Sequence, residues 1–187
     1  MVSPAPQADD RQTFVDYDTD WPVRFVTIAA PLRAALPEAA VEHYGSTSVP
    51  GLGGRPIVDL QVALPPGTER ESFEPILATL GYVPFIPPDM ASLADDGMIV
   101  YVPADGGNAV HIAVVSAGGF HHRRQLAVRD YLRAHPQEAA AYAEVKRQAA
   151  ASAGGVRERY AAAKGDFVAG LQERALRWAE QKATTEL

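Results

Sequence analysis

The stretch HYGSTSVPGLGGRPIVDLQV, at positions 43 to 62, constrains the fold more than any other part of the sequence. Small and turn-forming residues fill its first half, and an apolar run that contains one carboxylate, Asp59, fills the second. Val58, Leu60 and Val62 alternate with residues of mixed polarity, which is typical of a strand with two unlike faces. The stretch therefore predicts a tight loop that leads into a strand, with Asp59 close to the loop.

The loop has the composition of a phosphate-binding turn. Gly45 can adopt backbone angles that are closed to other residues, and it lets a bound group approach the chain closely. Ser46, Thr47 and Ser48 supply hydroxyls and amides that can surround a phosphate oxygen. Asp59 would then face the ligand and coordinate a Mg²⁺ ion that also touches the phosphate. A Ser/Thr-capped turn ahead of a buried strand explains the same residues without a ligand, and the spacing alone leaves both interpretations open.

Hydrophobic periodicity predicts the order of the other elements. Helices are expected over 21–36, 72–80 and, in three pieces, from 123 to the end. Strands are expected over 40–44, 56–64, 98–104 and 108–116, the last two joined as a hairpin through DGGN. This order predicts an α/β (α+β) fold with a mixed sheet and flanking helices. We divide it into an extended N-terminal segment (1–20), an α/β core (21–120) and a C-terminal helical segment packed on the core (121–187).

Composition limits the class of partner and the compartment. A formal net charge of −6 argues against bulk nucleic acid, because phosphate contacts need clustered Lys and Arg. The absence of cysteine excludes disulfides, thiolate metal sites and a cysteine nucleophile. No signal peptide and no membrane-spanning run is apparent, so a cytoplasmic location is expected. The sequence does not indicate an oligomeric state.

The motifs resemble those of the GrpB family, also called UPF0157. The resemblance is carried by VEHYGSTSVPGLGGRPIVDLQV, VHIAVV and VRDYLRAHPQEAAAYAEVKRQAA, and it covers nearly the whole chain after residue 17. It implies the nucleotidyltransferase (DNA polymerase β-like) fold. It places Gly45 and Ser46 on the Gly-Ser signature that contacts nucleotide phosphates, and Asp59 on the first metal-binding carboxylate. The implied activity is Mg²⁺-dependent transfer of a nucleotidyl or related phosphoryl group, from a nucleoside triphosphate to a small acceptor.

Two positions depart from the superfamily pattern. Gln61 stands where a second carboxylate usually completes a two-metal site, so replacement ligands such as Glu42 or Asp89 would be needed. His111 stands where a third acid usually lies, and imidazole suits Mg²⁺ badly. The departures favour an alternative, a non-catalytic ligand-binding or regulatory module on the same fold. A repurposed enzyme of specialised metabolism is the third possibility.

Histidines beside these motifs admit two interpretations each. His43 can bind phosphate or relay protons, but a structural histidine is favoured. His111 stands alone among Val and Ile, where a polar ring needs a reason to be buried. His121 and His122 are expected to be solvated.

The helical half supplies candidate cations. The spacing alone fits a solvated helix face, but the family resemblance implies that Arg129 binds a phosphate or carboxylate of the ligand, whereas Arg133, four residues on, is expected on the solvated face. Tyr142 with Lys146, and Tyr160 with Lys164, have the same i, i+4 spacing, so each pair can present a hydroxyl and an ammonium together. The candidate catalytic residues are Asp59 (also the metal ligand), Arg129 and His111. The candidate residues for binding a small phosphorylated or carboxylated ligand are Gly45, Ser46, Thr47, Ser48, Arg55, Lys146, Tyr160 and Lys164.

Overall fold

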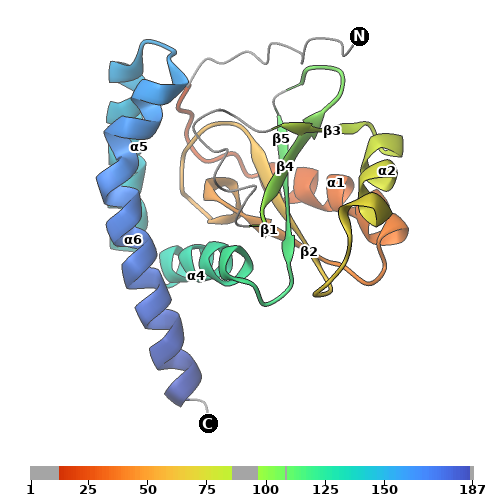
Figure 1. Cartoon of the computed structure of the whole chain (residues 1–187). Helices are drawn as coiled ribbons and strands as arrows, with labels where there is room; N and C mark the ends of the chain where they lie inside the picture. Colours follow the sequence, from red (N-terminus) through yellow and green to blue (C-terminus); the bar gives the residue numbers. More distant parts are fainter. Residues whose placement is uncertain (1–12, 86–96, 108, 186–187) are drawn as a thin grey trace.

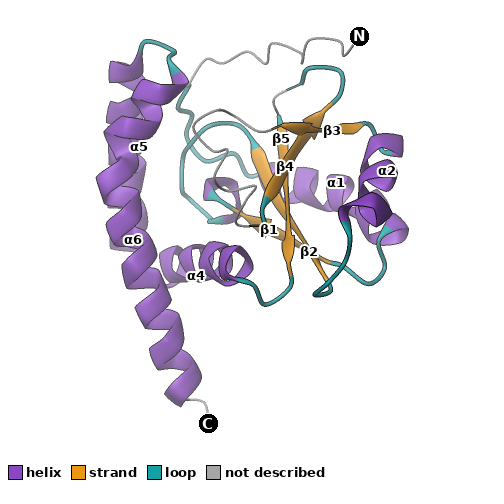
Figure 2. Cartoon of the chain, viewed as in Figure 1, coloured by secondary structure: helices purple, strands orange, loops and turns teal. Residues whose placement is uncertain are grey.

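Five strands form one mixed sheet with helices on both faces, as the computed structural model of the chain shows (Figures 1 and 2). The structure describes residues 13–85, 97–107 and 109–185. The strands are β1 (Ala40–Tyr44), β2 (Val58–Leu64), β3 (Tyr82–Phe85), β4 (Ile99–Pro103) and β5 (Val110–Ser116). The helices are α1 (Trp21–Ala35), α2 (Arg70–Thr79), α4 (Phe120–Ala134), α5 (Pro136–Ala153) and α6 (Arg157–Thr185), with a short 3₁₀ helix, η1, over Ser46–Ser48. The predicted mixed sheet with flanking helices is confirmed.

The strand order is β1-β2-β5-β4-β3, and only the β2–β5 pair is parallel among the described strands. The register places Tyr44 opposite Asp59, and Asp59 opposite His111. Because side chains opposite one another across a ladder lie on the same face, these three form one row across β1, β2 and β5. The row lies at the edge of the sheet where β1 leads into the loop of residues 45–57.

The two faces of the sheet are covered by different helices (Figure 1). On one face Leu60, Val62 and Ile112 are buried against α1 and α2, in the largest apolar cluster. On the other face lie α4 and, beyond it, the α5–α6 pair. A second apolar cluster joins the loop after η1 to the helices, with Val49 and Leu171 almost fully buried in it. The helical segment therefore packs directly over the loop that the sequence singled out.

Most of the expected elements are present, with two differences. The hairpin of β4 and β5 and the glycine that ends α2, Gly81 with φ +85°, are as predicted. Strand β3 was not predicted, because Pro84 interrupts its apolar run; the strand lies at the edge of the sheet, where proline is tolerated. Helix α4 begins at Phe120 rather than at 123. None of the helices in the described residues is long and apolar enough to cross a membrane.

His43 has the surroundings of a structural histidine. Its ring stacks on Phe25 of α1 with 4.7 Å between centroids, and its Nε2 lies 2.9 Å from Oγ1 of Thr47. Burial of the ring lowers the pKa of His43 from 6.5 to about 4, and Arg133 and Arg129 act in the same direction. The imidazole is therefore neutral at pH 7 and contacts α1, on the face of the sheet away from Asp59.

We expect His43 to make folding stability depend on pH. Between pH 6.5 and 4 the unfolded chain binds a proton at His43 that the folded chain does not. The contribution of the neutral His43 to the free energy of unfolding is therefore complete above pH 6.5 and is lost as the pH falls toward 4. The loss is up to about 3 kcal/mol, at about 1.4 kcal/mol for each pKa unit. Urea unfolding of the wild type and of His43→Gln at pH 7, 5.5 and 4.5 measures it. The free energy of unfolding of the variant should fall less on acidification than that of the wild type. An equal fall in the two proteins would contradict this role of His43.

Candidate functional site

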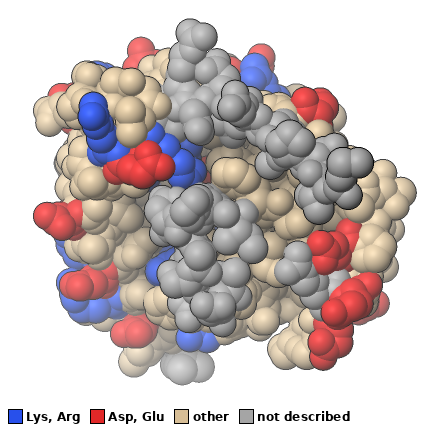
Figure 3. Space-filling view, turned by 45° about the horizontal axis from the view of Figure 1, so that its top comes forward, with Lys and Arg blue, Asp and Glu red and all other residues tan. Residues whose placement is uncertain are grey.

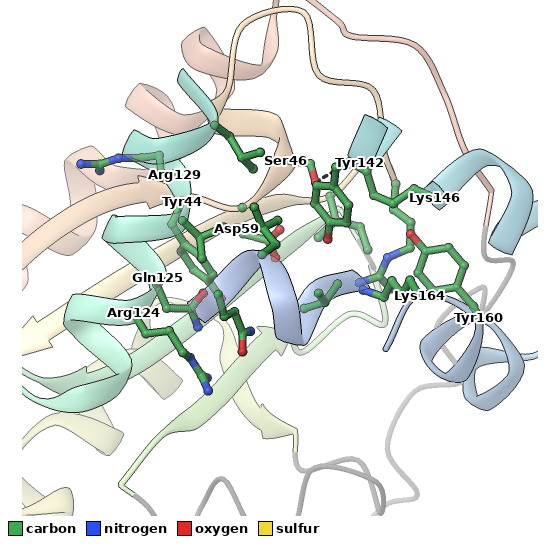
Figure 4. A pocket seen from close by; sticks show the side chains of 18 residues that line it. Tyr44, Ser46, Asp59, Arg124, Gln125, Arg129, Tyr142, Lys146, Tyr160 and Lys164 are labelled. Carbon is green, nitrogen blue, oxygen red and sulfur yellow. Dashed lines mark hydrogen bonds between the residues drawn. The ribbon is translucent and has the colours of Figure 1, made fainter. Parts of the chain in front are cut away.

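A cavity of about 220 Å³ lies between the loop side of the sheet and helices α4, α5 and α6. Figure 4 shows Ser46, Asp59 and Tyr142 near its centre, with Lys146, Lys164 and Tyr160 to one side. The lining residues come from every part of the chain that meets there: Tyr44, Gly45, Ser46, Arg55, Ile57, Asp59, Arg124, Gln125, Val128, Arg129, Leu132, Tyr142, Lys146, Tyr160, Lys164, Val168, Leu171 and Gln172. The core provides the floor, and the helices provide most of the walls.

Gly45 and Asp59 are in close contact at the floor. Gly45 has φ +71° and ψ −172°, a region that residues with a side chain essentially do not occupy. A Cβ atom at this position would lie 2.4 Å from Oδ2 of Asp59. Glycine is thus required twice here, for the backbone angle and for the space that the carboxylate fills. Ser46 follows directly and starts the 3₁₀ turn, so its side chain lies in the cavity beside Asp59.

Lys146 joins helix α5 to the loop. Its Nζ donates a hydrogen bond to Oγ of Ser46 at 2.7 Å and another to the carbonyl of Gly53. The side chain is 2% exposed, and its Nζ lies 4.4 Å from the centroid of the Tyr142 ring. Lys146 therefore reaches the cavity from the side opposite the sheet, with its ammonium held over the turn.

Lys164 and Arg55 complete a cluster of cations around Tyr160. Nζ of Lys164 lies 5.0 Å from the centroid of the Tyr160 ring, and Cζ of Arg55 lies 5.7 Å from the same centroid. Burial first, and then the nearby Lys164, lowers the pKa of Lys146 from 10.5 to about 7, although Asp59 opposes the change. Burial, then Arg55, lowers the pKa of Lys164 to about 8. Like charges thus crowd a partly desolvated space, which is an arrangement that an anion would relieve.

Tyrosine hydroxyls add neutral donors to these charges. Burial raises the pKa of Tyr44, Tyr142 and Tyr160 above the ordinary value of 10, and Asp59 acts in the same direction on all three. The phenols therefore stay protonated at neutral pH and can donate hydrogen bonds to a ligand.

Thr47 and Ser48 are not brought to the cavity, although the sequence predicted their hydroxyls there. Oγ1 of Thr47 lies next to His43, and Oγ of Ser48 donates a hydrogen bond to the carbonyl of Gly45 at 2.6 Å. The reason is the 3₁₀ turn, in which three successive side chains point in three directions. Only Ser46 of the three faces the cavity.

Arg129 and Arg133 fasten α4 to the loop side of the core. Arg129 lines the cavity, but it pairs with Asp130 at 2.7 and 3.1 Å and donates to the carbonyl of His43. Figure 4 shows its guanidinium pointing away from Asp59. Arg133 is exposed, as predicted, with 42% of its side chain accessible, but it also contacts the loop, because its Nε and Nη2 both donate to the carbonyl of Ser48. Arg129 as a ligand-binding or catalytic residue stays a prediction without support from this geometry.

The donors around Asp59 suit Mg²⁺ poorly. Among the described residues that line the cavity, Asp59 is the sole acid, and no group of three His, Asp or Glu side chains in the described part of the chain can hold a metal ion. Nδ1 of His111 is 3.6 Å from Oδ1 of Asp59, beyond hydrogen-bonding distance, and His111 does not line the cavity. The cations that face Asp59 also oppose a divalent ion, so these residues do not build a metal site by themselves.

Glu42, one of the proposed replacement ligands, bonds to a histidine instead of lining the cavity. Gln61 is fully buried, and its amide has no hydrogen-bond partner among the described residues. Oε2 of Glu42 accepts a hydrogen bond at 2.9 Å from His122, whose Nδ1 accepts from the amide of Gly118. Asp89 lies outside the described residues. The prediction of a solvated His122 was therefore wrong.

His121 was also predicted to be solvated, and it is 4% exposed. It lies on the first turn of α4, where its Nδ1 is 3.1 Å from Nη2 of Arg124. Sequence reasoning placed these histidines in a polar loop because it started α4 three residues too late.

Several lining residues were missed by the motifs, among them Tyr44 and Gln125. Tyr44 precedes Gly45 directly, and its place in the same row as Asp59 follows only from the β1–β2 register. Gln125 lies one helical turn before Arg129, so the i, i+4 spacing that identified the lysine pairs also indicates it.

Three comparisons relate the chain to known proteins. A family model described as GrpB protein matches residues 12–174. A UPF0157 protein of Pseudomonas aeruginosa is 36% identical over 172 residues, which are 90% of this chain and 69% of that protein. The crystal structure of the conserved protein GrpB from Enterococcus faecalis superposes with a TM-score of 0.78 at 25% identity, over 89% of this chain and 99% of that one. A poly(U) polymerase, Cid1, has a TM-score of only 0.45 at 14% identity over 71% of this chain and 42% of its own, too low to carry an argument.

Substituting the two loop glycines separates backbone strain from the contact with Asp59. Gly51 also has a positive φ, +80°, but a Cβ there would meet nothing within 4 Å. We expect Gly51→Ala to lower the free energy of unfolding by about 1 to 2 kcal/mol through strain alone. Gly45→Ala should lower it by at least about 2 kcal/mol more than that, because the clash with the Asp59 carboxylate adds to the strain. Urea unfolding measures both, and equal losses would show that Gly45 and Asp59 are not in contact.

Proposed function

The chain belongs to the GrpB family, as its motifs predicted, and from this premise we propose that its pocket binds a small phosphorylated or carboxylated molecule. The observation that carries the proposal is the imbalance of charge in the cavity. Two lysines and three arginines are among the described residues that line it, against one acid, Asp59. The chain as a whole carries a formal charge of −6, so the cations are concentrated against the overall trend.

The contacts of these cations indicate where an anion is held. Arg129 is paired with Asp130, and Lys146 is held over Ser46 and Gly53. Lys164 and Arg55 lie together at Tyr160, so an anionic group placed there meets two cations and a phenol. A planar guanidinium can grip two oxygens of a phosphate or carboxylate at once. We therefore assign the anion to the Arg55–Lys164 side of the cavity, with Ser46 on its other side.

The size and the apolar walls limit the rest of the ligand. The cavity, about 220 Å³, is smaller than the roughly 300 to 1,000 Å³ of sites that bury drug-sized molecules. An acidic group with a small body fits, whereas a nucleoside triphosphate would have to leave part of itself outside. Ile57, Val128 and Leu171 provide apolar contacts for that body. Asp59 has no hydrogen bond to a Lys or Arg side chain in the described part of the chain, so its carboxylate can accept a hydrogen bond from a ligand hydroxyl.

The outer surface supports a small ligand rather than nucleic acid. On the face in Figure 3, Lys and Arg of the described residues are interspersed with Asp and Glu, and no continuous basic surface forms there. Nucleic-acid binding relies on such a surface, because it neutralises several phosphates at once. Among the described residues, two lysines and three arginines line the cavity instead.

A second candidate function is Mg²⁺-dependent nucleotidyl transfer, which the contact between Asp59 and the Gly45 turn favours. Because Asp59 is the sole acid among the described lining residues, the metal would have to take most of its ligands from the nucleotide phosphates and water. This requirement separates the two candidates. The first predicts anion binding in the presence of EDTA, and the second predicts that a triphosphate binds only with Mg²⁺.

Sulfate is a suitable probe for the anion site, because it stays doubly charged across the neutral range. We expect calorimetric titration in EDTA to show binding that Lys164→Gln weakens about tenfold or more, as expected for the loss of a charge-assisted contact. Lys182→Gln removes a cation from an exposed position of the same helix and should have little effect. Equal effects of the two substitutions, or no sulfate binding, would contradict the proposal.

The same titration should depend on pH in a defined direction. The pKa values of Lys146 and Lys164, about 7 and about 8, mean that both lose their protons as the pH rises from 6 to 9. Sulfate affinity should therefore be highest at pH 6 and fall by about tenfold or more by pH 9. A constant affinity over this range would show that the charges of Lys164 and the neighbouring Lys146 do not contribute to anion binding.

A further inference from the structure

The hydrogen bond between Ser46 and Lys146 is the feature that anion binding leaves unexplained. A serine hydroxyl in the cavity and a buried lysine amine are 2.7 Å apart, and they come from positions 100 residues apart in the sequence. Ser46 is half-buried and open to the cavity, whereas Lys146 is 2% exposed. A hydroxyl that faces a binding site and contacts a basic nitrogen on its other side is the arrangement of an activated nucleophile.

We propose that Ser46 is a nucleophile and Lys146 its general base, in acyl transfer from a small carboxylic ester that carries an anionic group. The proposal rests on the proposed function, because Arg55 and Lys164 would hold that anionic group. Serine–lysine pairs are one of the known variants of serine-based acyl transfer. The acyl carbon would lie between Ser46 and the apolar wall.

The surroundings of the pair hold it in a reactive geometry. Lys146 donates to the carbonyl of Gly53, which fixes the direction of the amine. In the neutral amine the remaining lone pair can then accept the proton of Ser46. Gly54 leaves room for the contact, since a Cβ there would lie 3.1 Å from both Nζ of Lys146 and Cβ of Ser46. The pair is therefore packed from three sides and open on the fourth, toward the cavity.

Burial and the neighbouring cations keep a large fraction of the Lys146 side chains neutral near pH 7. Its pKa, about 7, is lowered by burial first and then by Lys164 and Arg55, while Asp59 raises it. Tyr142 lies over the amine, and the other titratable side chains of the cavity are those of Tyr44, Tyr160, Arg124 and Arg129. A general base is most effective when its pKa is close to the working pH.

The reaction balances without any further reagent. As the bond from Oγ of Ser46 to the acyl carbon forms, the hydroxyl proton moves to Nζ of Lys146. The bond from the acyl carbon to the leaving oxygen then breaks, and Lys146 returns the proton to that oxygen, which departs as an alcohol. Water, or an acceptor alcohol or amine, attacks the ester on Ser46 with Lys146 again taking the proton. The product, either the free acid or the acylated acceptor, leaves, and Lys146 returns the proton to Oγ of Ser46.

A fluorophosphonate probe tests the pair directly, because a nucleophilic serine displaces its fluoride and keeps the phosphonyl group. Intact-mass and peptide mass spectrometry of the full chain should show one adduct, on Ser46. Ser46→Ala should abolish it, and Lys146→Met should slow it at least tenfold. Ser48→Ala is the matched control, since Ser48 lies in the same turn but bonds to the carbonyl of Gly45, and it should label at the wild-type rate.

The pH profile of the wild type keeps the test decisive even if Lys146→Met fails to fold. The labelling rate should rise with pH through a midpoint near 7, as the neutral amine forms. An absent adduct, an adduct on another residue, or a rate indifferent to pH or to Lys146→Met in a folded variant would overturn the assignment. Failure of labelling with sulfate binding intact would reject this inference alone. Labelling of Ser46 without sulfate binding would reject the anion site instead.

Discussion

The contact between Gly45 and the Asp59 carboxylate is the constraint on which the site depends. It needs a residue without a side chain at a positive φ, and it needs β1 and β2 in the register that places Tyr44 opposite Asp59. When both hold, the chain turns at the end of β1 so that Ser46 comes to lie beside Asp59. The 3₁₀ turn then directs the side chains of Thr47 and Ser48 into the core, where they hold the loop in place. One close contact thus fixes the floor of the cavity.

The helical segment contributes charge to that floor. Lys146 of α5 and Lys164 of α6 come from separate helices, and they meet only because both helices pack over the loop, as Figure 1 shows. Placing cations in a partly desolvated space costs free energy unless an anion accompanies them. The lowered pKa values of the two lysines express that cost. The same electrostatic cost that favours an anionic ligand also lowers the pKa of Lys146 to about 7, so that a neutral amine is present to accept the proton of Ser46.

Local sequence signals predicted the parts of this arrangement that depend on neighbours along the chain. The Gly-Ser turn and the strand with Asp59 follow from local composition and spacing. Lys146 and Lys164 were assigned to the site by the family resemblance, because their i, i+4 spacing alone also fits an amphipathic surface. What failed depends on side-chain direction or on contacts between distant segments. His122 reaches the carboxylate of Glu42 across 80 residues, and the burial of His121 follows from the packing of α4 on the sheet. No periodicity along one helix distinguishes such a contact from a solvated face.

The most direct test of the anion pocket is anomalous diffraction from crystals grown with tungstate and, separately, with Mn²⁺ in place of Mg²⁺. Both scatter strongly enough to be located without ambiguity. The account predicts a tungsten peak in the cavity between Ser46, Arg55 and Lys164, and no manganese peak at Asp59 when no triphosphate is present. A manganese ion bound at Asp59 without a nucleotide, or tungstate absent from the cavity, would contradict it.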